Sequence, residues 1–166
     1  MIRQALITIA FILALVPMVA GAQAERPRIR VVVQAMEPVP GGANNPLAPQ
    51  AVTQAAGRII AEQGYQWAPL DSERLPVGST VIRVLYVVSE RGASASSVVA
   101  ASAATQLLQA SNIGGGNLVL SLYNGVQQNI SQVTNLGTAR AQVHDLFVKE
   151  LRERITNALN HLENVE

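Results

Sequence analysis

The sequence predicts an α+β domain in which a β-α-β unit is followed by a mostly antiparallel meander, with two helices packed on one face of the sheet. Two segments, residues 50–63 and 138–162, space their apolar residues at three and four positions, which is typical of amphipathic helices. Apolar runs of strand length, bounded by glycines, fill most of the chain between these helices. At 166 residues, the chain is long enough for one such domain.

The chain begins with a pattern typical of an export signal. Arg3 supplies a positive charge, and the apolar run Ala5–Val19 precedes small residues that suit a cleavage site. This run is shorter than the ~20 residues that cross a membrane and contains Pro17, so we expect cleavage, with a retained anchor as the alternative. The expected organisation is a signal peptide at 1–24 and a single α+β domain at 25–166, exported to the periplasm.

The composition excludes several classes of protein. Of the 12 basic residues one lies in the signal peptide, so the mature chain balances its 11 acidic residues and is neutral. A neutral chain offers no electrostatic footprint for nucleic acid or for an anionic membrane surface. The lack of cysteine excludes disulfides, thiolate metal sites and a cysteine-linked lipid anchor. No second apolar run reaches about 18 residues, so we expect no membrane span after signal cleavage.

Residues 28–35 are predicted as the first strand, because apolar and polar side chains alternate along them. The segment Pro38–Pro49 contains four prolines and two glycines, which predicts a long loop and a candidate contact surface. The helix at 50–63 follows and ends before Gly64, a residue typical of a helix C-terminus. A short strand beginning at residues 65–67 would complete the β-α-β unit.

The meander begins with the most strand-prone segment, residues 80–90, which we expect to be a central strand. Residues 94–110 fit either an alternating strand or an alanine-rich helix. We favour a strand, because glycines at position 92 and at 114–116 bracket the segment as the turns of hairpins would.

The next segment, residues 117–123, alternates as a strand does. Asn124-Gly125 is a strong signal for a two-residue hairpin turn, which predicts a returning strand at 126–133. The closing helix at 138–162 has Thr138 as its expected N-cap. Its apolar stripe consists of Val143, Leu146, Phe147, Leu151, Ile155, Ala158, Leu159 and Leu162.

The order of these elements resembles a module of bacterial envelope proteins. Residues Val31-Val32-Val33, the helix ending at Ile59–Tyr65, the strand Val81–Val88 and the closing helix carry the resemblance. Examples of the module are the amino-terminal domain of the translocation protein TolB, the curli secretion lipoprotein CsgG, and the lipoprotein activators of penicillin-binding proteins. The resemblance implies a binding or assembly role rather than catalysis. The last two examples are lipoproteins, whereas this chain has no lipid-accepting cysteine.

Residue types suited to catalysis or metal binding are sparse. His144 and His161 are 17 positions apart on one helix, or about 25 Å, so they cannot share a metal ion within one chain. Asp145 adjoins His144, but neighbouring helical residues point about 100° apart, so we expect no catalytic pair. Asp71 and Glu73 fit a solvated turn. We therefore assign no catalytic residue, no metal ligand and no cofactor.

Three arginines form the candidate ligand-binding set. Arg83 interrupts an otherwise apolar strand, so it must pair with a carboxylate or reach an exposed face of the sheet. Arg28 and Arg30 share one face of the first strand. If that strand lies beside Arg83, the three side chains form a basic strip that would bind an anionic group.

The expected function is that of an exported, non-enzymatic envelope protein that binds another envelope protein, as a component of an assembly or secretion system. Two alternatives stay open. Residues 123–135 are rich in asparagine and glutamine, which is also typical of self-assembling β-proteins, so the chain would form homo-oligomers. The other alternative is a small-ligand binder or enzyme that uses Arg83.

Overall fold

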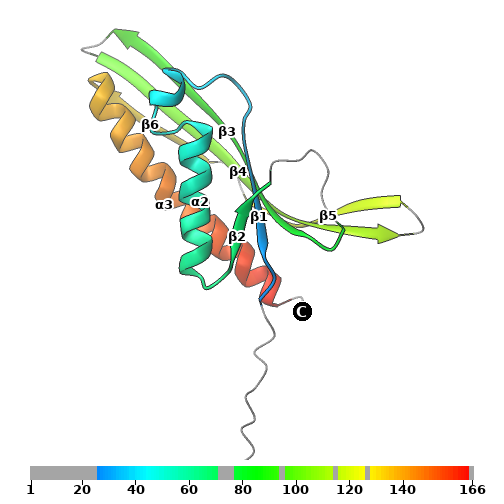
Figure 1. Cartoon of the computed structure of the whole chain (residues 1–166). Coiled ribbons are helices and arrows are strands. Elements are labelled where there is room, and N and C mark those ends of the chain that lie inside the picture. The colour runs from blue at the N-terminus through cyan, green and yellow to red at the C-terminus, as the bar shows by residue number, and fades with distance from the viewer. Residues whose placement is uncertain (1–25, 71–76, 94–95, 114–115, 126–127, 165–166) are drawn as a thin grey trace, which may run out of the picture.

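The structure is a computed structural model that describes residues 26–70, 77–93, 96–113, 116–125 and 128–164. In these residues one six-stranded mixed sheet forms a layer, and two helices lie together against one of its faces (Figure 1). The predicted α+β class, with both helices on one face, is confirmed. The expected signal peptide and the carboxylates Asp71 and Glu73 lie outside the described residues.

The sheet joins a parallel half to an antiparallel half. Its order is β2-β1-β3-β4-β5, with β6 also paired to β4. Strand β1 is parallel to both β2 and β3, whereas β4 is antiparallel to β3, β5 and β6. The elements are β1 (Ile29–Ala35), the short 3-10 helix η2 (Gly42–Asn44), α2 (Pro49–Glu62), β2 (Trp67–Pro69), β3 (Thr80–Ala93), β4 (Ser96–Ile113), β5 (Gly116–Asn124), β6 (Gln128–Thr134) and α3 (Leu136–Glu163).

The predicted strand at 94–110 is confirmed as β4, whose 18 residues make it the longest strand described. The hairpin predicted at Asn124-Gly125 is wrong. The N–H of Gly125 donates to the Thr105 carbonyl at 2.7 Å, so the chain continues along β4 instead of turning back. Strands β5 and β6 therefore pair end to end with the second and first halves of β4. Pairing with β4 outweighs the local turn preference, because β4 is long enough to pair with both β5 and β6.

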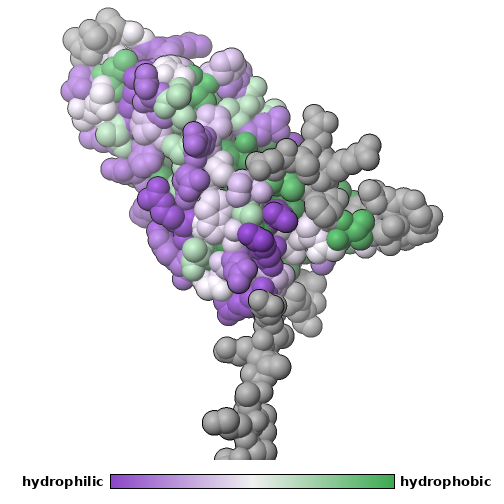
Figure 2. Space-filling model, in the orientation of Figure 1, coloured by the Kyte–Doolittle hydropathy of each residue, from purple (hydrophilic) through white to green (hydrophobic). Residues whose placement is uncertain are grey.

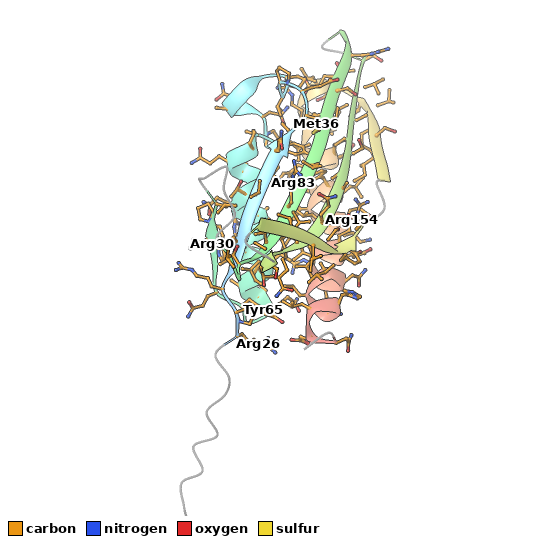
Figure 3. The ribbon with its side chains drawn as sticks, turned by 90° about the vertical axis from the view of Figure 1, so that its right-hand side faces the viewer. Arg26, Arg30, Met36, Tyr65, Arg83 and Arg154 are labelled. Atoms are coloured by element: carbon orange, nitrogen blue, oxygen red, sulfur yellow. The ribbon has the colours of Figure 1, made fainter. Side chains whose placement is uncertain are left out.

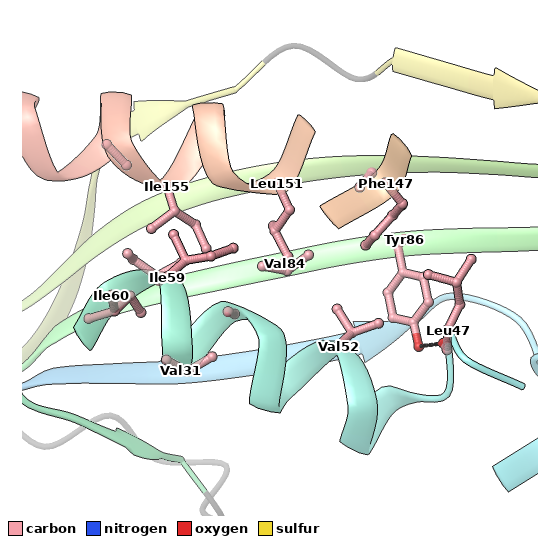
Figure 4. Packing of buried hydrophobic residues seen from close by; sticks show 14 of the residues in the cluster. Val31, Leu47, Val52, Ile59, Ile60, Val84, Tyr86, Phe147, Leu151 and Ile155 are labelled. Atoms are coloured by element: carbon pink, nitrogen blue, oxygen red, sulfur yellow. Dashed lines mark hydrogen bonds between the residues drawn. The ribbon is translucent and has the colours of Figure 1, made fainter. Parts of the chain in front are cut away.

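The core fills the space between the helices and the sheet. In Figure 4 side chains of α2 and α3 meet those of β1 and β3, among them Ile59, Leu151, Val31 and Val84, which are at most 2% exposed. Burial of such side chains contributes about 1.5–3 kcal/mol each, so this layer supplies most of the folding free energy.

The two helices differ in how they begin. Helix α2 starts at Pro49, a residue tolerated in a first helical turn because its missing N–H has no helical partner there. Helix α3 is capped by Asn135, whose side-chain oxygen accepts the N–H of Thr138 at 3.0 Å. The prediction of Thr138 as the N-cap is therefore wrong by three positions, because the asparagine side chain satisfies the terminal N–H first.

Helix α2 packs closely on β2 at one glycine. A Cβ atom built on Gly57 would lie 2.1 Å from the ring of Trp67, so only glycine allows this approach. The contact holds α2 beside β1 and β2, at the same edge of the sheet. The opposite face of the sheet carries no described helix, and we call it the open face (Figures 1 and 3).

Candidate functional site

A groove lies between the end of β1 and the outward side of α2. Its volume is about 1020 Å³. Most of its lining is apolar, and its charged members are Glu37 beyond β1 and Arg58 on α2. The lining residues are Ala35, Met36, Glu37, Pro38, Val39, Gly42, Ala43, Ala48, Pro49, Gln50, Ala51, Gln54 and Arg58. We call this feature the β1–α2 groove.

The sheet edge beside this groove has backbone groups that no described strand uses. Strand β2 pairs only with Ile29–Val31, and the N–H of Leu70 donates to the Val31 carbonyl at 2.9 Å. The N–H of Met36 instead donates to Tyr86 of β3, at 2.8 Å. Since backbone direction alternates along a strand, the N–H and C=O of Val33 and Ala35 point outward. We call these four groups the β1 outer edge.

The Pro38–Pro49 loop, predicted as a contact surface, forms one wall of the groove and is tied to the rest of the fold. Asn45, which is 2% exposed, donates from Nδ2 to the Pro40 carbonyl at 2.8 Å and to Glu90 Oε1 at 3.1 Å. Arg140 of α3 donates to both oxygens of the same glutamate at 2.7 Å. This hydrogen-bonded ion pair raises the pKa of Arg140.

A second contact fixes the same loop from the core. The hydroxyl of Tyr86 on β3 donates to the Leu47 carbonyl at 2.7 Å, and both residues are 1% exposed (Figure 4). Burial raises the pKa of Tyr86 to about 12. The loop is therefore held by β3 and by α3, and the wall of the groove is preorganised.

The sequence could not reveal this network, because its members are distant along the chain. One signal was present: Glu90 shares the strand face of Val84 and Val88, which face the helices, so a charge there needed a partner. A similar signal marked Arg154, which falls within the apolar face of α3. Arg154 is 7% exposed and donates to the Ala103 carbonyl, with Glu150 at 3.9 Å.

The structure brings the predicted arginines to one face. The β1–β3 register pairs Arg30 with Val81 and Val32 with Arg83, so Arg30 and Arg83 are diagonal neighbours on the open face (Figure 3). Arg28 lies one residue before β1, and the same alternation would place it on this face if the extended backbone continues. Arg83 donates from Nη2 to Gln34 Oε1 at 3.1 Å. Arg30 and Arg83 thus share a face, and a basic strip that binds an anionic group stays a prediction.

The two histidines occupy separate parts of α3. His161 lies by the ring of Tyr123, with ring centroids 6.4 Å apart. His144 and Asp145 do lie within hydrogen-bond distance, with Nδ1 and Oδ1 3.1 Å apart, and the expectation that they form no catalytic pair stays a prediction. Both side chains lie on the helix surface, where they can turn toward each other, and Asp145 is 82% exposed. Within the described ranges, no three His, Asp or Glu residues gather as a metal site would require.

Comparisons with known proteins give structural similarities at low sequence identity. Neither a protein-family model nor a curated protein matches the sequence. Among solved structures, the lipoprotein GNA1162 from Neisseria meningitidis is similar at 15% identity and a TM-score of 0.44, over 79% of this chain and 99% of that chain. The hypothetical protein CT253 from Chlamydia trachomatis is similar at 11% identity and a TM-score of 0.41, over 78% and 97%.

Such low identities do not transfer a function to this chain. In the part of the chain that the structure describes, neither helix is both long and apolar enough to cross a membrane.

Proposed function

We propose that this chain is an exported, non-enzymatic protein of the cell envelope that binds an extended segment of another protein along the β1 outer edge. The observation that carries the proposal is the juxtaposition of Val33 and Ala35 backbone groups with an apolar groove of about 1020 Å³. An extended segment would hydrogen-bond to this edge as an added strand, continuing the line of β2.

The groove defines the chemistry of the segment. Side chains of an added strand alternate between two sides, so every second one would face Ala51 and Gln54 of α2. Small apolar side chains fit the alanine-rich lining. Helix α2 runs antiparallel to β1, so Arg58 lies toward the start of β1, where it would attract an acidic group of the segment.

Preorganisation favours this use of the groove. Binding costs free energy when loops must become ordered, and here Asn45, Glu90 and Arg140 already hold the loop wall. The element order and the expected signal peptide support a place in the envelope, as part of an assembly or secretion system. The neutral charge of the mature chain supports a protein partner over nucleic acid.

The proposal is tested by photo-crosslinking in living cells followed by mass spectrometry. A photoreactive residue at position 51, in the groove, should form adducts with a different protein. The matched control variant carries the photoreactive residue at position 142, since Gln142 is exposed on α3. Equal adducts from both positions would contradict the proposal.

A proline at position 35 provides the sharper test. The Ala35 N–H points away from β3, so Ala35→Pro removes one outward donor and leaves the β1–β3 ladder intact. The position-51 adducts should disappear in this variant and persist in the control Ala35→Ser. Both variants should keep the circular dichroism of the parent. Adducts that survive Ala35→Pro would exclude strand addition to β1.

A further inference from the structure

A second surface, separate from the β1–α2 groove, is distinguished by its lack of charge. Residues 93–139 contain no Asp, Glu, Lys, Arg or His, although the whole chain holds 12 basic and 11 acidic residues. This stretch forms β4, β5 and β6. Natural proteins protect exposed sheet edges with charged residues or prolines, and this edge has neither.

The end of this uncharged region extends beyond the helices. Residues 108–113 of β4 pair with 116–121 of β5 in a β-hairpin that projects away from α2 and α3, and only its base, residues 108–110, also pairs with β3 and the residues just before it (Figure 1). We call it the projecting hairpin. Val119 and Leu120 are 47% and 40% exposed, and a hydrophobic patch marks this part of the surface in Figure 2. Beyond Ala110 the hairpin has only two strands, and a two-stranded ribbon is marginal in water, so this end gains from a partner.

The backbone of β5 is ready to pair on its outer side. The N–H of Ala110 donates to the Ser79 carbonyl at 3.1 Å, and its carbonyl accepts the N–H of Gly78 at 2.8 Å. Ala110 lies opposite Val119, so this pair of the β4–β5 ladder makes no mutual hydrogen bonds. The N–H and C=O of Val119 therefore point away from β4, where no described strand pairs with β5.

We propose that a second copy of this chain pairs antiparallel with β5, with a two-fold axis at Val119. Antiparallel pairing of one strand with itself generates this symmetry and buries the same surface on both copies. Residues near the axis then lie close to their own copies, so any charge there would be repelled by its equivalent. The absence of charge across residues 93–139 suits this arrangement.

The side chains favour a second copy over a lipid surface. Ser121 shares the face of Val119, and Gln109 lies opposite Leu120. Each face of the projecting hairpin thus mixes a polar with an apolar side chain. Lipid would leave the Gln109 amide without water to hydrogen-bond, whereas the Ser121 hydroxyl already donates to Asn124 Oδ1 at 3.2 Å.

Cysteine crosslinking tests the pairing, because the chain has no cysteine of its own. In the proposed pair the two Val119 Cα atoms are about 5.5 Å apart, within the range of a disulfide. The chain exported with Val119→Cys should form a disulfide-linked dimer in high yield. The matched control is Val133→Cys on β6, which is 66% exposed and lies away from the axis. A monomeric Val119→Cys chain, or equal dimer from both variants, would overturn the proposal.

Analytical ultracentrifugation of variants without cysteine provides an independent test. Val119→Pro removes the outward N–H from both copies, so the dimer dissociation constant should rise about tenfold or more. Val119→Thr keeps the donor and should leave the constant within about twofold. A wild-type chain that is monomeric throughout, or that associates only with phosphatidylethanolamine–phosphatidylglycerol vesicles, would contradict the second copy. Neither result bears on the Ala35→Pro crosslinking test, so the two proposals fail separately.

Discussion

The two ends of one sheet are built differently. At the β1 end, α2 lies beside the strand, and the groove between them carries Glu37 and Arg58. At the β5 end, the projecting hairpin extends past both helices (Figure 1), and residues 93–139 have no charge at all. Both ends expose unpaired backbone groups in the described structure, but their surroundings differ in charge and in cover.

This difference indicates what each end accepts. An edge beside a helix leaves a narrow, shaped space, which suits one extended segment with matching side chains. A bare edge without charge carries little to distinguish partners, since charge patterns provide much of the specificity of interfaces. Such an edge is most compatible with its own copy.

The largest expected effect separates the folding core from the projecting hairpin. Ile59 on α2 is 1% exposed and packs against β1, so Ile59→Ala should lower the free energy of unfolding by about 3 kcal/mol. Val119→Ala should change it by less than about 0.5 kcal/mol under dilute, monomeric conditions. Urea denaturation measures both values. A large loss from Val119→Ala would mean that the hairpin belongs to the folding core.

The next effect concerns the loop wall of the groove. Glu90 is 11% exposed and binds both Asn45 and Arg140, so Glu90→Ala should destabilise the chain by about 2 kcal/mol. It should also weaken binding in the groove and leave self-association at β5 unchanged. The exposed pair Arg152–Glu62 is the control, because solvent screens it and Arg152→Ala should destabilise the chain far less than Glu90→Ala. Equal losses would show that Glu90 does not order the loop.

The pH dependence of stability sharpens the same point. Burial raises the pKa of Tyr86 from 10.0 to about 12, so the protonated hydroxyl favours the folded state. This contribution is complete below pH 10 and is lost as the pH rises through 12. Tyr86→Phe should lower the free energy of unfolding by about 1 kcal/mol at neutral pH, because the hydrogen bond to the Leu47 carbonyl is lost. Since phenylalanine has no hydroxyl to ionise, the variant should lose less stability than the parent as the pH rises above 10. Parallel alkaline curves for the two proteins would contradict this assignment.

The smallest effect lies in β4, between the two ends. Thr105 is fully buried, and its hydroxyl has no hydrogen-bond partner within the described structure. Thr105→Val should therefore raise the midpoint of urea denaturation, with a gain of about 0.5–1 kcal/mol. Thr105→Ser keeps the hydroxyl and should be less stable than the parent. A loss of stability in the valine variant would indicate that this hydroxyl is satisfied.

Much of the fold could be predicted because its signals are local. The spacing of apolar residues predicted α2 and α3, and alternation predicted β1. A strand-prone apolar run predicted β3, and the glycines that bracket residues 94–110 favoured a strand for β4. The error at Asn124-Gly125 came from a local turn signal that yielded to pairing with β4, a strand distant in sequence. Sequence patterns do not specify which strands pair, and that pairing decides where an edge is exposed.

The candidate sites were predictable only in part. The prolines and glycines of the Pro38–Pro49 segment indicated a long surface loop, and this loop does line the groove. The contacts of Asn45 with Glu90 and Arg140 join three segments that only the folded chain brings together. The β1 outer edge likewise depends on β2 being three residues long, which no residue pattern predicts.

The measurement that tests the central comparison most directly is amide hydrogen exchange of the exported chain, read by NMR at low and high protein concentration. The Ala35 amide should exchange without protection at both concentrations, because no part of the described chain pairs with it. The Val119 amide should become protected as the concentration rises and a second copy binds β5. Equal exchange of the two amides at every concentration would contradict the account that the two ends of the sheet serve different partners.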